Sequence, residues 1–219
     1  HLTAPRHDRA ARGRGACEDG QAGVVPVAYN RHDSGPVVMT MPELLHDPIR
    51  AVGGDPDSLV TMRRLDPAYR AVYPDGSELH IRADMDDLRE EIRTKVGAAD
   101  AAGFDRFLDW LEQLYDTEFD TFVDHNYSSP LDLLRSPTTA LKLLRLGGLG
   151  ALGPAVDRYF TDDRLTRIFS FQALYAGIAP AKARAVLAVI TYMDTVRGVF
   201  YPEGGMHGVP RGMAQALTD

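Results

Sequence analysis

The stretch Phe104-Asp-Arg-Phe-Leu-Asp-Trp-Leu-Glu-Gln-Leu-Tyr115 carries an apolar side chain at every third or fourth position. Phe119 and Phe122 continue this pattern, which predicts an amphipathic helix of about five turns. The opposite face of the helix is acidic, through Asp105, Asp109, Glu112, Asp116 and Asp120. We therefore expect the aromatic face to be buried and the acidic face to lie in solvent.

Helical patterns also occur on both sides of this stretch. Met85, Leu88, Ile92 and Val96 form an apolar stripe at helical spacing. Carboxylates stand at the start of the stripe, where they complement the helix dipole; they are Asp84, Asp86 and Asp87. Three more helices are predicted, over residues 162–175, 180–193 and 210–217.

A small antiparallel sheet is predicted ahead of these helices. Its strands are expected at residues 58–62, 68–73 and 78–82. Leu79 and Ile81 alternate with polar neighbours, a period of two that buries one face of a strand. Pro74-Asp-Gly76 is a turn signal between the last two strands, because proline presets φ and glycine accepts a positive φ. The predicted fold class is therefore α+β and predominantly helical.

The composition excludes several classes of protein. With 44% hydrophobic and 25% charged residues, the chain has the make-up of a soluble globular protein. A net charge of −7 argues against a nucleic-acid partner, because phosphate binding needs clustered Lys and Arg. The one cysteine, Cys17, rules out an intramolecular disulfide and fits a reducing compartment. No signal peptide is visible, and no apolar run approaches the ~20 residues that span a bilayer. The expected location is the cytoplasm.

Two stretches near opposite ends of the chain carry the strongest functional signal. They are Asp33-Ser-Gly-Pro36, which runs on to Pro42, and Gly198-Val-Phe-Tyr-Pro-Glu-Gly-Gly-Met206. Between them, Phe171-Gln-Ala-Leu-Tyr175-Ala-Gly177, Pro180 and Tyr192 follow in order. As a set, these residues resemble the phytoene desaturase (bacterial carotenoid desaturase) family of FAD-dependent oxidoreductases. The resemblance runs from Asp33 to the end of the chain, although His32 replaces the aromatic residue that usually precedes the aspartate.

The resemblance implies a cofactor, a substrate and residues for each. The cofactor is FAD, contacted by Asp33, Ser34, Gly35, Pro36, Gly204, Gly205 and Met206. The substrate is an apolar polyene, and its binding site is lined by Phe171, Tyr175, Tyr192, Phe200 and Tyr201. The implied activity is the introduction of carbon–carbon double bonds into a carotenoid precursor, in carotenoid biosynthesis. Glycines suit the flavin contact, because they allow the backbone to approach a planar ring closely. No catalytic acid or base is identified.

The resemblance also implies an incomplete chain, inactive alone and with four parts. Residues 33–57 are expected to be part of the FAD domain, 58–200 the substrate-binding sheet and helices, and 201–219 a return segment toward the FAD domain. Residues 1–32 are expected to be irregular. Their Arg, Gly and Ala bias is what a wrong reading frame in a GC-rich gene would give, and a divergent or trimmed terminus is the alternative.

The glycine-rich strand-to-helix turn that holds a pyrophosphate is expected to be missing. Arg12-Gly-Arg-Gly15 is interpreted instead as a flexible basic segment, because no β-branched run precedes it and no amphipathic helix follows.

Other functions remain open at this point. A carotenoid isomerase or oxygenase of the same family is one alternative, and a non-catalytic helical module for apolar ligands or membranes is another. Residues 130–159 combine many leucines with Lys142 and Arg145, a composition that suits a peripheral membrane contact. The scattered histidines show no zinc-ligand spacing, so no metal is expected. Hydrolytic catalysis finds no support, because Ser128-Ser-Pro130 lacks the context of a nucleophile elbow.

Overall fold

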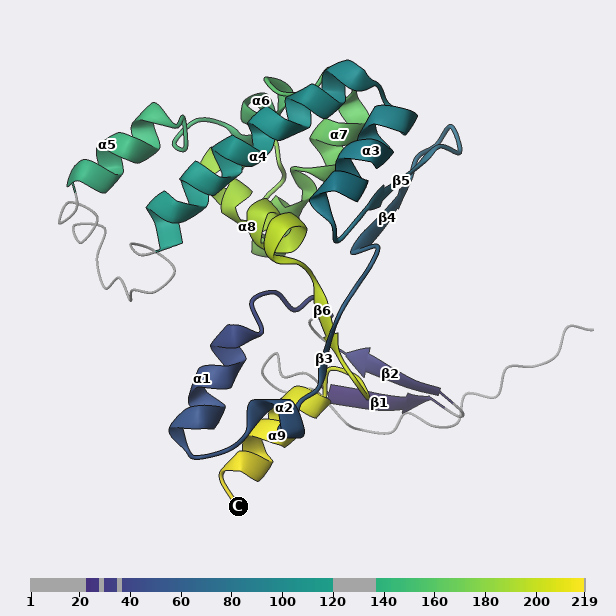
Figure 1. Cartoon of the computed structure of the whole chain (residues 1–219), viewed down its shortest axis with the longest axis vertical. Coiled ribbons are helices and arrows are strands. Elements are labelled where there is room, and N and C mark those ends of the chain that lie inside the picture. The colour runs from purple at the N-terminus through teal and green to yellow at the C-terminus, as the bar shows by residue number, and fades with distance from the viewer. Residues whose placement is uncertain (1–22, 28–29, 35–36, 120–136, 219) are drawn as a thin grey trace, which may run out of the picture. The chain divides into compact units, whose positions relative to one another are not determined.

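The predicted amphipathic helix is present as α4 (Ala98–Glu118) (Figure 1). The computed structural model describes residues 23–27, 30–34, 37–119 and 137–218. The buried face of α4 consists mainly of the aromatic and leucine residues of the sequence pattern, Phe104, Phe107, Trp110, Leu111 and Leu114. Because each of these side chains packs against other buried apolar residues, α4 is the centre of the main hydrophobic core.

The chain divides into two units. Residues 39–44 and 63–200 form one, called the helical unit below. The described residues of the ranges 1–38, 45–62 and 201–219 form the other, called the terminal unit. Strand β3 (Met62–Arg64) pairs with β6 (Phe200–Pro202), and the boundary between the units falls inside both strands.

Helix α3 (Met85–Lys95) packs against α4 in the helical unit. Its start was predicted from the acidic residues, and Asp84 indeed caps it. The Asp84 carboxylate accepts hydrogen bonds from the backbone N–H groups of Asp86 and Asp87, at 2.8 and 3.0 Å. Two donors that the first turn would leave unsatisfied are thus bonded. Leu88 and Ile92 of the predicted stripe are buried.

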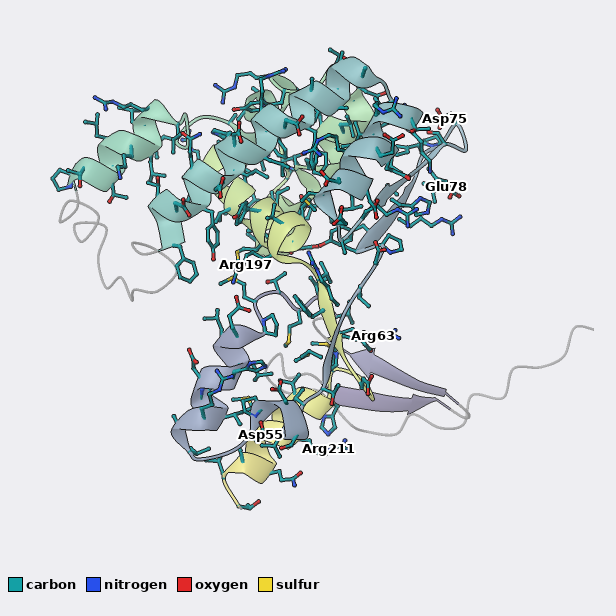
Figure 2. The ribbon with its side chains drawn as sticks, in the orientation of Figure 1. Asp55, Arg63, Asp75, Glu78, Arg197 and Arg211 are labelled. Atoms are coloured by element: carbon teal, nitrogen blue, oxygen red, sulfur yellow. The ribbon has the colours of Figure 1, made fainter. Side chains whose placement is uncertain are left out.

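The predicted hairpin is formed by β4 (Tyr69–Val72) and β5 (Glu78–Ile81), which pair antiparallel. Leu79 and Ile81 are buried, as the alternation indicated. Asp75, labelled in Figure 2, stabilises the turn by accepting a hydrogen bond from the Ser77 N–H at 2.9 Å. The hairpin matters for the site because Tyr69 lies at its first position.

The strand predicted at residues 58–62 begins later than expected. Pro56 opens a short helix, α2 (Pro56–Leu59), and the Asp55 side chain accepts from the Asp57 N–H at 3.3 Å. Proline at the first helical position and an aspartate cap favour a helix start over extended chain. The backbone becomes extended at Val60, and the paired strand β3 starts at Met62.

The helices predicted over 162–175 and 180–193 are each divided into shorter pieces. The first becomes α7 (Asp163–Ile168) and the 3₁₀ helix η3 (Phe171–Ala176). The second becomes the 3₁₀ helix η4 (Ala185–Leu187), α8 (Ala188–Tyr192) and the π-helix η5 (Met193–Arg197).

Long-range hydrogen bonds of the main chain account for the second division. The N–H groups of Ala185 and Val186 donate to Gly150 and Gly148, both at 2.9 Å, instead of to the preceding helical turn. The Ala183 carbonyl accepts from the Leu152 N–H, also at 2.9 Å. Residues 183–186 are therefore held to the loop between α5 (Pro137–Arg145) and α6 (Leu152–Asp157).

In the terminal unit, the residues that the structure describes form a β-hairpin and three helices. Strands β1 (Gly23–Val27) and β2 (Asn30–Ser34) pair antiparallel. The helices are α1 (Glu43–Ala51), whose first two residues belong to the helical unit, α2, and α9 (Gly208–Ala216), near the helix predicted at 210–217. Ile49, Val60 and Ala216 form a small buried cluster. The hairpin lies where irregular chain was expected; the β-branched run Val24-Val-Pro-Val27 favours extended backbone there.

The predicted fold class is confirmed: the structure is α+β, predominantly helical, with small two-stranded sheets. Over the described ranges, none of the helices combines the length and apolarity required to cross a bilayer. The assignment of 33–57 and 201–219 to an FAD domain, and of 58–200 to substrate binding, stays a prediction.

Candidate active site

Three side chains from separate elements meet in the helical unit. They are Tyr69 of β4, Tyr175 of η3 and Asp194 of η5. The Tyr69 hydroxyl donates a short hydrogen bond to Asp194 Oδ2, and the Tyr175 hydroxyl lies next to the Tyr69 hydroxyl. The two phenol oxygens lie 3.3 Å apart. A carboxyl group and two hydroxyl groups thus form one connected polar cluster.

The backbone conformation around Asp194 positions its side chain beside Tyr69. Asp194 lies in a π-helical turn that closes with a hydrogen bond of 3.0 Å from the Gly198 N–H to the Met193 carbonyl. A π turn holds more residues than an α turn, and such turns occur often at functional sites. Gly198 ends the turn with a φ of 99°, a conformation that favours glycine.

Burial changes the acidity of all three groups. Asp194 is only 1% exposed, and desolvation raises its pKa to about 6, although hydrogen bonds from Tyr69 and Tyr175 oppose the rise. Burial also raises the pKa of Tyr175 to about 12. The pKa of Tyr69 is raised by burial and by the adjacent Asp194 charge. At neutral pH the cluster therefore holds a carboxylate and two neutral phenols.

Aromatic and aliphatic side chains surround this cluster. The Phe171 ring packs edge-on against the rings of Tyr69 and Tyr175, with centroids 5.4 and 5.9 Å apart. Next to Phe171, a hollow of about 380 Å³ is lined by Tyr69, Ala71, Tyr73 and Ile168, together with Arg70 and Arg167. Leu174, Tyr175 and Ile178 add exposed apolar surface after Phe171. A buried acid thus lies directly behind an apolar face.

The structure brings together only some of the predicted substrate residues. Phe171 and Tyr175 are neighbours in the cluster. Tyr192 instead stacks on Tyr115, with ring centroids 4.5 Å apart. Phe200 pairs with Met39: its N–H donates to the Met39 carbonyl at 2.7 Å, so the chain following Asp33–Pro36 meets the chain leading to Tyr201. Tyr201 itself belongs to the terminal unit.

Comparison with known proteins identifies the family. The flavin containing amine oxidoreductase family matches residues 31–219. The chain belongs to this family. It is also 46% identical over 200 residues to a phytoene dehydrogenase of Streptomyces griseus, covering 91% of this chain and 39% of the relative. A zeta-carotene-forming phytoene desaturase of Myxococcus xanthus is 28% identical over 191 residues, 85% of this chain and 36% of that protein.

A third relative, the carotenoid 3,4-desaturase of Haloarcula japonica, is 27% identical over 202 residues, 90% of this chain and 39% of that protein. The resemblance to the phytoene desaturases, predicted from the sequence, is confirmed. The chain spans less than two-fifths of the length of these relatives. Membership in the flavin containing amine oxidoreductase family implies FAD, the cofactor that the sequence predicted.

Those residues predicted to contact FAD that the structure describes belong to the terminal unit. Asp33 and Ser34 lie in β2, opposite Val24 and Gly23, whereas Gly35 and Pro36 lie outside the described residues. Gly204 and Gly205 follow β6 with φ angles of 82° and 97°, and the side chain of Met206 is buried. A Cβ atom added at Gly204 would meet nothing within 4 Å. This open, left-handed turn leaves the backbone accessible at Gly204, and the contact of these residues with FAD stays a prediction.

The glycine spacing of a dinucleotide turn does occur in the chain, contrary to expectation, at Gly148, Gly150 and Gly153. Its surroundings do not suit a pyrophosphate, because a helix, α5, precedes it in place of a strand. The N–H groups of Gly148 and Gly150 are already bonded to the carbonyls of Leu143 and Gly147, at 2.8 and 2.9 Å. We therefore assign this loop to packing against residues 183–186.

Tyr69 and Asp194 were not among the residues singled out from the sequence. One signal pointed to Asp194: it is the only charged residue between Arg184 and Arg197, within a largely apolar segment. A carboxylate in such a segment is buried with its neighbours and needs polar partners. The partner Tyr69 could not be found in this way, because 125 positions separate the two residues.

Proposed function

We propose that this chain supplies the substrate-binding part of a phytoene desaturase-like, FAD-dependent oxidoreductase that introduces double bonds into a carotenoid precursor. The observation that carries the proposal is the 46% identity to the Streptomyces griseus phytoene dehydrogenase across 91% of the chain. The apolar face around Phe171 supports it, because a polyene offers almost nothing to hydrogen-bond and is bound by aromatic and aliphatic surface.

In this proposal the two units have different tasks. Phe171 and Tyr175 contact the polyene and keep water from it, while Gly204 and Gly205 allow the backbone to approach the flavin. When bound, the flavin would accept the hydride that leaves the substrate. Hydride acceptance by the cofactor explains why no nucleophile or metal site is needed for the proposed reaction.

The proposal is tested by exchanging this chain for its counterpart in a relative. A chimera of the Streptomyces griseus enzyme, in which residues 33–219 replace the aligned segment, is expressed in bacteria that accumulate phytoene. We expect coloured desaturated polyenes, detected by chromatography and absorbance, as with the unaltered enzyme. A folded, flavin-containing chimera that forms no desaturated product would contradict the proposal. Product identity separates a desaturase from the isomerase and oxygenase alternatives.

We further propose that the protein is cytoplasmic and touches the membrane surface through α5. Leu141 and Leu144 are 48% and 61% exposed, and with Arg145 they share one helix face at spacings of three and four. Lys142 and Arg145 lie in the last turn of the same helix. Exposed leucines next to basic residues suit an interface with anionic lipid, from which an apolar substrate could be drawn.

The membrane contact predicts a charge effect. Vesicles containing anionic lipid should retain the chain in a flotation assay, and Lys142→Glu with Arg145→Glu should weaken retention by about 2 kcal/mol, roughly thirtyfold. Arg50→Glu with Arg211→Glu makes the same change in net charge at exposed positions of the terminal unit and serves as control. If the vesicles retain both double variants equally, the proposed membrane contact is wrong.

A further inference from the structure

The polar cluster of Tyr69, Tyr175 and Asp194 lies where an apolar surface has no structural need for it. Phe171 covers one side, and the adjacent hollow has an almost entirely apolar wall. A buried carboxylate costs free energy unless it is bonded, and here the bond comes from Tyr69, whose hydroxyl group is in turn next to that of Tyr175. Tyr69 lines the hollow and bonds to Asp194, so it connects the apolar surface to the acid.

We propose that Asp194 is the proton acceptor of the desaturation, reached through the hydroxyl groups of Tyr175 and Tyr69. This inference rests on the proposed function, because only a desaturation releases a proton at this face. The two tyrosines contact the substrate, and Asp194 acts through them. Tyr175 is suited to the contact, since its side chain is 47% exposed while its hydroxyl oxygen lies 3.3 Å from that of Tyr69, which donates to the buried carboxyl group.

The proposed step conserves atoms and electrons. Forming a carbon–carbon double bond removes a hydride from one carbon and a proton from its neighbour. The oxidant that takes the hydride would be a bound FAD. The second C–H bond then breaks, and its electron pair becomes the π bond. Its proton passes to the Tyr175 oxygen, the proton of that hydroxyl group moves to the Tyr69 oxygen, and the Tyr69 proton moves to the Asp194 carboxylate.

The surroundings of Asp194 keep it available as a base. Facing it are Tyr69 from β4 and Tyr175 from η3. Arg197, on the same turn as Asp194 and labelled in Figure 2, pairs with Glu43. Arg64 donates to the carbonyls of Ala83 and Val196, at 3.0 and 3.3 Å. Within the described part of the chain no cation pairs with Asp194, so its negative charge is held only by hydrogen bonds.

A titration of the chain alone tests the acid without substrate or flavin. Infrared carboxyl bands are followed against pH in the Glu118→Gln background. Glu118 is also buried, and desolvation raises its pKa to about 8, so the substitution removes its overlapping signal. We expect a carboxyl band that titrates near pH 6 and disappears in Asp194→Asn. An Asp194 band that titrates near the ordinary value of about 3.9 would overturn the inference.

The stability of the chain gives a second readout of the same group. The folded pKa of Asp194 lies above its unfolded value, so the folded state binds more protons between about pH 4 and pH 6. The free energy of unfolding should therefore fall as pH rises through this window. Asp194→Asn should remove that part of the pH dependence, and an unchanged slope would contradict the assignment.

Activity is measured in the chimera described above, with Glu118→Gln as the matched control. Asp194→Asn should slow desaturation about a hundredfold or more, and the fall in rate below pH 6 should vanish. Tyr175→Phe, which removes only one hydroxyl group from a half-exposed side chain, should also slow the reaction while the chimera stays folded. Glu118→Gln should leave rate and pH profile unchanged.

The outcomes separate the two proposals. If Asp194→Asn forms product at the rate and with the pH profile of the parent, the inference fails and the proposed function stands. If neither parent nor variant forms product although both fold and bind flavin, the proposed function fails and this inference with it. A band near pH 6 would then show only that the cluster holds a proton.

Discussion

Gly103→Ala is expected to destabilise the helical unit by more than about 4 kcal/mol, among the largest effects of a single methyl group. Gly103 lies in α4 where the main chain of Tyr159 crosses it. A Cβ atom at this position would lie 2.0 Å from the Tyr159 carbonyl oxygen. The obstacle is backbone, which cannot rotate away as a side chain can, so one of the two segments must move. Urea unfolding followed by circular dichroism measures the loss.

Gly153→Ala is the matched control. Gly153 also lies in a helix, α6, but an added Cβ would meet nothing within 4 Å. Alanine loses less backbone entropy on folding but is disfavoured in helical backbone before Pro154, so this substitution should change stability by no more than about 1 kcal/mol in either direction. Equal effects of the two substitutions would contradict the close approach of α4 and Tyr159.

Phe107→Ala is expected to cost about 3–5 kcal/mol of unfolding free energy. The Phe107 side chain is fully buried, and its ring contacts four other aromatic rings at centroid distances of 5.2 to 5.8 Å: Trp110, Tyr159, Phe160 and Phe169. Alanine would leave a cavity among groups that are too tightly packed to close it. The same unfolding experiment measures the effect.

Leu144→Ala provides the comparison for Phe107, because Leu144 is exposed. Its substitution should change stability by no more than about 0.5 kcal/mol. A loss at Phe107 as small as that at Leu144 would show that α4 is not the centre of the core.

Local sequence signals predicted those parts of the fold that local interactions determine. Asp84 directly precedes α3, and its carboxylate accepts hydrogen bonds from two nearby N–H groups. Such a cap can be predicted from the sequence. The turn at Pro74-Asp-Gly76 likewise marked the hairpin. The divided helices could not be predicted, because bonds between residues 183–186 and the glycine loop decide them.

The candidate site shows the same limit. Phe171 and Tyr175 were predicted as substrate residues from motif order, and the structure places them beside each other. Tyr69 and Asp194 come together only through the tertiary fold, so no spacing rule could pair them. Sequence patterns report on one element at a time, whereas this cluster takes one residue from each of three elements.

The π-helical turn at Met193–Arg197 has a consequence for how relatives are compared. Removing one residue from this turn would rotate the residues before it by about 100° around the helix axis. The acid would then no longer point at the two phenols. In a homologue one residue shorter between α8 and β6, a different group must therefore accept the proton that the substrate releases. The length of this short segment, more than the identity of its residues, should therefore indicate which family members use this acid as the base.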